Sequence, residues 1–93
     1  MKNRVIRVDG KKLEPYKKVK FGNFFAMDVP CYEEVRVISE DGGIVASIRY
    51  PEVIERISSA YAISLSSGLH EPEELESLVK LVKKIAKALG YKI

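Results

Sequence analysis

The chain has 93 residues, of which 46% are hydrophobic and 31% charged, with one cysteine, one histidine and a net charge of +3. This composition excludes a disordered chain and a disulfide-stabilised scaffold, and no apolar run reaches the roughly 18 residues of a membrane span. The amino-terminal residues are charged and lack the apolar segment of a secretory signal. We therefore expect one soluble cytoplasmic domain over residues 1–93, and its Lys-, Glu- and Arg-rich composition is typical of proteins from thermophiles.

Short strands are predicted in the first third of the chain. Arg4 to Val8 reads as a strand, and Asp9-Gly10 is a strong turn dipeptide. The residues after this turn are a poor partner strand, because Pro15 interrupts them and Arg7 would face Lys12. Two further extended segments and the turn between them follow at Lys17 to Phe21, Gly22-Asn23 and Phe24 to Val29.

The clearest hairpin spans Glu34 to Tyr50, with Asp41-Gly42 as a two-residue type I′ turn. Such a turn fixes the register, and one face of the hairpin is then apolar while the other is wet. The apolar face pairs Val35 with Ile48 and Val37 with Ala46, and the wet face pairs Glu34 with Arg49 and Arg36 with Ser47.

Two helices are predicted after the hairpin. The first begins at Pro51 and includes Tyr61 to Leu65, although that segment also alternates like a strand. The second begins at Pro72, has acidic residues in its first turns and lysines in its last turns, and ends before Gly90. Strands followed by helices predict the α+β class: a small antiparallel sheet of three to five short strands, including the 34–50 hairpin, with two helices packed on one face.

The apolar stripe of the last helix is wider than packing on one domain requires. Seven apolar side chains cover an arc of about 120°, and two flanking residues widen it to roughly 180°. One interpretation is a well-buried core helix, and the other is a helix that also supplies an oligomer contact. The wide stripe favours a homodimer, with an interface formed by Leu78, Leu81, Ile85 and Ala88.

No group of residues predicts catalysis or metal binding. His70 precedes the last helix, so the helical spacing that would pair it with Glu73 or Glu74 is lost. Cys31 lies among acidic neighbours and is expected to be a buried, inert thiol. The segment 66–68 lacks the G-x-S-x-G pattern of a nucleophile elbow. We therefore predict no enzyme, no cofactor and no metal, with an active site shared across a dimer interface as the alternative.

Charge is segregated along the chain. Residues 1–27 carry a net charge of +6, residues 28–76 of −8 and residues 77–93 of +5. The first block contains the basic aromatic segment 11–25, whose lysines suit phosphates and whose rings suit bases. Within it, Lys20 to Phe25 resembles the RNP1 motif of RRM and cold-shock domains, but its Gly and Phe are in a different order and no RNP2 motif accompanies it. The predicted nucleic-acid contacts are Lys11, Lys12, Tyr16, Lys17, Lys18, Lys20 and Phe21.

Two functions are thus compatible with the sequence. The first is a small soluble protein that acts through self-association or protein–protein contacts, with a homodimer favoured. The alternative is a nucleic-acid-binding module that uses the segment 11–25. No membrane partner is predicted by either.

Overall fold

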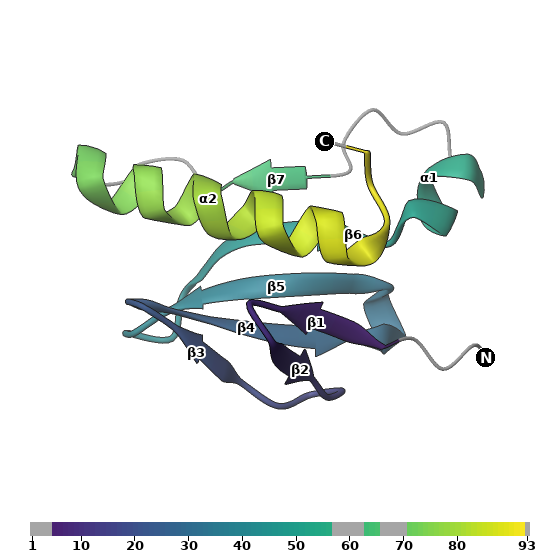
Figure 1. Ribbon diagram of the computed structural model, residues 1–93, viewed down its shortest axis with the longest axis horizontal. Coiled ribbons are helices and arrows are strands. Elements are labelled where there is room, and N and C mark those ends of the chain that lie inside the picture. Colours follow the sequence, from purple (N-terminus) through teal and green to yellow (C-terminus); the bar gives the residue numbers. More distant parts are fainter. Residues whose placement is uncertain (1–4, 57–62, 66–70, 93) are drawn as a thin grey trace.

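The computed structural model describes residues 5–56, 63–65 and 71–92. It contains a five-stranded antiparallel sheet in the order β3-β4-β5-β6-β7 and a separate β1–β2 hairpin. The long helix α2 runs across the large sheet, and the β1–β2 hairpin lies beside it (Figure 1). The elements are β1 Ile6–Val8, β2 Lys11–Leu13, β3 Val19–Phe21, β4 Phe24–Val29, the 3₁₀ helix η1 Pro30–Tyr32, β5 Glu34–Ser39, β6 Ile44–Arg49, α1 Pro51–Arg56, β7 Ile63–Leu65 and α2 Pro72–Leu89. Across these described segments, no helix combines the length and the apolar character needed to cross a membrane.

The α+β class agrees with the structure, but two helices packed on one face are not confirmed. α1 ends at Arg56, and the residues 63–65, predicted to be helical, form β7 beside β6. The intervening residues 57–62 lie outside the described part of the chain. A short apolar segment fits both periodicities, and pairing with a strand elsewhere in the sequence decides which one forms.

The β1–β2 hairpin forms although its sequence looked unfavourable. The turn residues Asp9-Gly10 have φ angles of 50° and 77°, as a type I′ turn requires. Arg7 does face Lys12, but both are exposed, so water screens a repulsion that costs less than about 1 kcal/mol. Each buried apolar side chain contributes about 1.5–3 kcal/mol, which outweighs that cost. The hairpin buries three: Ile6, Val8 and Leu13.

The central β5–β6 hairpin has the predicted register except at its turn. All four predicted cross-strand pairs are present. The register shifts at the end of β5, where Ile38 pairs with Ile44, and the turn consists of the three residues 40–42 rather than two. Gly42 has φ of 95°, the left-handed conformation that closes a three-residue loop with a bulge. The prediction of a two-residue turn is therefore wrong.

α2 begins and ends where predicted. A proline occupies its first turn, and Gly90 follows its last residue with φ of 108°. The N–H groups of Gly90 and Tyr91 donate to the carbonyls of Lys87 and Ala86, both at 3.0 Å, which is the Schellman arrangement. The Tyr91 hydroxyl then donates to the carbonyl of Arg49 at 2.6 Å, so the end of the helix is joined to β6.

The two faces of the five-stranded sheet have different surroundings. Alternate residues of the strands, among them Ala26, Val35 and Val37, form the core face, which packs with buried side chains of α2 and of the β1–β2 hairpin. The remaining alternate residues form what we call the outer face. By register these are Lys20, Phe25, Met27, Val29, Glu34, Arg36, Ile38, Ile44, Ser47 and Arg49.

Candidate functional site

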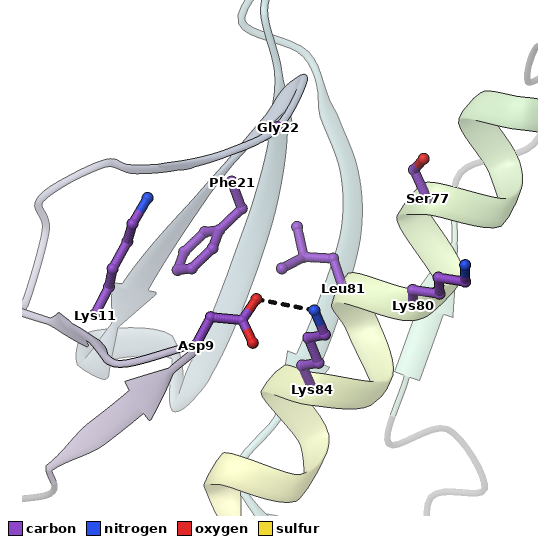
Figure 2. A pocket seen from close by; sticks show the side chains of 8 residues that line it. All are labelled: Asp9, Lys11, Phe21, Gly22, Ser77, Lys80, Leu81 and Lys84. Carbon is purple, nitrogen blue, oxygen red and sulfur yellow. Dashed lines mark hydrogen bonds and ion pairs between the residues drawn. The ribbon is translucent and has the colours of Figure 1, made fainter.

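A groove of about 340 Å³ opens between α2 and two turns of the chain (Figure 2). One wall is α2, and the other is formed by the β1–β2 turn and the β3–β4 turn, so the groove joins segments from the two ends of the chain. Phe21 and Leu81 face each other across its apolar floor (Figure 2). Polar side chains from both walls surround this floor.

The wall from α2 is basic. Ser77, Lys80, Leu81 and Lys84 line the groove, and their i, i+3, i+4, i+7 spacing places them on one side of the helix. The Lys84 Nζ lies 2.9 Å from Asp9 Oδ2 on the β1–β2 turn. Both side chains are about half exposed (52% each), so this ion pair contributes about 0–1 kcal/mol. It is nevertheless a direct side-chain contact between the helix and the turn.

The opposite wall carries another ammonium group. The Nζ of Lys11 donates a hydrogen bond to the carbonyl of Lys20 at 2.7 Å and lies 5.0 Å from the centroid of the Phe21 ring. The β3–β4 turn begins directly after Phe21. Gly22 adopts a φ of 62° in this turn, which is favourable for glycine. The Lys11 ammonium is therefore held beside the groove, although its residue is exposed.

Positive charge dominates the groove. Three lysines line it against one carboxylate, Asp9, which is already paired with Lys84. Lys80 pairs with Glu76 at 3.4 Å, but both side chains are about 70% exposed (70% and 71%), and solvent screens such a pair strongly. Ammonium groups around an apolar floor are suited to an anion that also carries a flat or apolar part.

All seven predicted nucleic-acid contacts lie in the described part of the chain. Lys11 and Phe21 line the groove. Lys20 belongs to the outer face, and the Lys18 Nζ lies 5.8 Å from the ring centroid of Phe25 on that same face. The basic aromatic segment thus contributes to two surfaces rather than one. The remaining contacts, which are exposed, are Lys12, Tyr16 and Lys17.

Tyr16 and Cys31 are neighbours in space. The backbone N–H of Cys31 donates to the Tyr16 hydroxyl at 3.1 Å, and a hydrogen bond with the Cys31 side chain raises the pKa of Tyr16. Cys31 is exposed, so the prediction of a buried thiol is wrong. The physical reason is local: η1 is a single turn between two strands, and it carries the cysteine on the surface.

The residues assigned to a dimer interface are used inside the chain. Leu78, Leu81 and Ile85 are 1%, 6% and 0% exposed, and Ala88 is half-buried against the same core. The side of α2 that carries Leu81 packs beside β1 and forms part of the floor of the groove. These side chains therefore already pack within one chain, and both the interface and the homodimer stay predictions, with less support from the wide stripe.

His70 and the segment 66–68 were the other candidate sites considered from the sequence. Both lie outside the described residues. Within residues 5–56, 63–65 and 71–92, no three His, Cys, Asp or Glu side chains are grouped so that they would hold a metal ion. The Glu34 carboxylate accepts a hydrogen bond from Arg36 at 2.7 Å, which raises the pKa of Arg36. Glu34 thus has a structural partner on the outer face.

Part of the groove was not predicted from the sequence. Lys80 and Lys84 belong to a carboxyl-terminal block whose positive charge was recognised, but only the apolar residues of the helix were placed on a face. Their i, i+4 spacing was the available signal. Asp9 was recognised as a turn residue, and its pairing with a lysine 75 positions away had no signal in the local sequence.

Comparison of this sequence and structure with known proteins identifies no relative. No protein-family model matches the sequence, and searches of curated proteins and of solved structures find no significant match.

Proposed function

We propose that this protein binds nucleic acid through the groove and the lysines of the segment 11–25, without catalysing a reaction. One observation carries the proposal: lysines from opposite ends of the sequence meet at one groove. Lys11 comes from β2, whereas Lys80 and Lys84 come from α2. A cytoplasmic location, as predicted from the sequence, belongs to the same proposal.

The chemistry of a phosphate backbone fits this surface. Each lysine that contacts a phosphate releases bound counterions, and this sequence-independent term supplies much of the affinity. The apolar floor, with the ring of Phe21, offers a contact for a base or a sugar beside the phosphates. Self-association has less support, because the side chains that were assigned to it are buried within one chain.

The salt dependence of binding tests the proposal. Fluorescence anisotropy of a labelled oligonucleotide should show an affinity that falls steeply as salt rises. Replacing Lys80 and Lys84 by Gln removes two candidate phosphate contacts, so the slope of log K against log salt should become shallower by about 1.4 for a single strand.

A matched variant separates local from overall charge. Lys83 and Lys92 are exposed but do not line the groove, so replacing both by Gln removes the same charge elsewhere. The slope for this control should change by much less. If neither single-stranded nor duplex oligonucleotides bind at low salt, or if both double variants behave alike, the proposed function is wrong.

A further inference from the structure

The outer face of the sheet combines aromatic rings with cations. Phe25 and Met27 are only half-buried there, whereas Ile38 and Val29 on the same face are 5% and 3% exposed. The described elements that cover the sheet, α2 and the β1–β2 hairpin, pack against its core face. The part of the outer face around Phe25 and Met27 therefore presents a partly apolar surface outside the main core cluster.

Two rings at this face lie beside a cation. The Lys18 Nζ is 5.8 Å from the centroid of Phe25, and the Arg36 Cζ is 4.7 Å from the centroid of Tyr32 on η1. Phe25 is half-buried and Lys18 is exposed, so a flexible lysine, rather than a packed core side chain, lies over this ring. Tyr32 is 60% exposed. Rings placed in this way can stack on a flat partner while the neighbouring cations meet its charge.

The charge of this face selects an anionic partner. Lys20, Arg36 and Arg49 belong to it by register, and Lys18 lies over it. Glu34 is the acidic residue that the register of the described strands places there, and its carboxylate is paired with Arg36 at 2.7 Å. A partner with both negative charge and flat rings complements such a surface.

The outer face is continuous with the groove. β3 is the edge strand of the sheet, so its edge alone separates the two surfaces. The Lys11 ammonium lines the groove and donates a hydrogen bond to the backbone carbonyl of Lys20 on β3. The side chain of Lys20 belongs to the outer face. A flexible polyanion can contact lysines on both sides of β3, whereas a stiff rod would touch only one of them.

We propose that the ligand is a single-stranded nucleic acid whose bases stack on Phe25 and Tyr32 while its phosphates contact lysines along the β3 edge and the groove. This inference rests on the proposed function and adds to it the class of nucleic acid and the place of the bases. In a duplex the bases are paired and stacked on one another, so the two rings can reach them only in a single strand.

The test compares an oligothymidylate about 12 nucleotides long, within the usual site size, with the same strand carrying abasic positions and with a duplex. The wild-type protein should bind the intact single strand at least about tenfold more tightly than the duplex or the abasic strand. Phe25→Leu keeps an apolar side chain but deletes the ring, and Tyr32→Ala alters an exposed position. Each should weaken single-strand binding about five- to 150-fold and leave the salt slope unchanged.

Loss of the base dependence separates stacking from structural damage. In Phe25→Leu, the intact and abasic strands should bind nearly alike, and Leu75→Ala, at an exposed position on α2, should behave as wild type. If the ring variants bind within twofold of wild type while the Lys80 and Lys84 variant is weakened, the groove binds nucleic acid but the outer face does not. Equal affinity for single strand and duplex would also overturn the inference, and absence of all binding would remove the proposed function with it.

Discussion

The two faces of the five-stranded sheet are built from alternate residues of the same strands, yet they leave very different surfaces. On the core face, Ala26, Val35 and Val37 are fully buried beneath α2 and the β1–β2 hairpin. On the outer face, Phe25 and Arg36 are only half-buried, and each takes part in a contact between a cation and a ring. The wide stripe of α2 serves the first face, so a recognition surface has to be sought on the second face and in the groove.

The largest expected effect is a charge placed beneath α2. Leu81 is 6% exposed within the core cluster, and Leu81→Glu would replace its apolar contacts by a carboxylate that loses much of its hydration. We expect a loss of about 3–5 kcal/mol in the free energy of unfolding, out of about 5–15 kcal/mol for a domain of this size. Urea denaturation followed by circular dichroism measures it.

The same variant distinguishes core packing from a dimer contact. An interface residue would yield a folded monomer, which sedimentation equilibrium would detect as a change in mass at unchanged stability. Leu75→Glu is the matched control, because Leu75 is 40% exposed on the same helix and its stability should change by less than about 0.5 kcal/mol. A folded and stable Leu81→Glu monomer would mean that our account of the core face is wrong.

A smaller effect is expected from the polar group of the core face. Asp28 is 2% exposed and, by its pairing with Val35, faces the core; its carboxylate accepts a hydrogen bond from the Tyr50 hydroxyl. Tyr50→Phe deletes that donor and keeps the ring, so the free energy of unfolding should fall by about 1.5–3 kcal/mol. Tyr32→Phe, at an exposed position of the outer face, should have almost no effect in the same urea experiment. Equal stability of the two variants would contradict this difference between the faces.

The groove offers a still smaller change, this time in affinity. Asp9→Asn removes the carboxylate that pairs with Lys84, and asparagine tolerates the positive φ of 50° at this turn. Stability should fall by less than about 1 kcal/mol, while affinity for a single-stranded oligonucleotide should rise about two- to fivefold, because one repulsive charge is gone. Anisotropy titrations at constant salt measure the change. A weaker affinity would show that the ion pair orders the groove more than its charge opposes the ligand.

The elements that the sequence predicted well are those determined by local chemistry. The proline at the start of α2 and Gly90 at its end mark both termini, and alternation between Glu34 and Arg49 sets the register of the central hairpin. For residues 63–65 the helix was favoured and the strand was the alternative, because a three-residue apolar segment becomes a strand only through its pairing with β6. The burial of Leu81 was likewise left as one of two alternatives, because it depends on packing with segments far away in the sequence.

In the candidate site, too, the features set by local sequence were predicted and those set by tertiary contacts were not. The basic aromatic segment was recognised from composition, and all five of its lysines are exposed. Its division between the groove and the outer face follows from the strand register of β3, which places Lys20 and Phe21 on opposite sides. The contribution of Lys80 and Lys84 requires α2 to pack against the β1–β2 turn, a tertiary contact without a local signal.

The smallest expected effect concerns Tyr16, which was predicted as a base contact but lies beside Cys31. The hydrogen bond with the Cys31 side chain raises the pKa of Tyr16 above its ordinary value of 10.0. Cys31→Ala deletes the thiol and keeps the backbone N–H, so the pKa of Tyr16 should move down, as an NMR titration of the tyrosine ring would report. Because the folded-state pKa is raised, any stability linked to it is present below about pH 10 and is lost as pH rises through the folded value. A bound single strand that leaves this titration unchanged, while it shifts the resonances of Phe25 and Tyr32, would place the bases on the outer face and not at Tyr16.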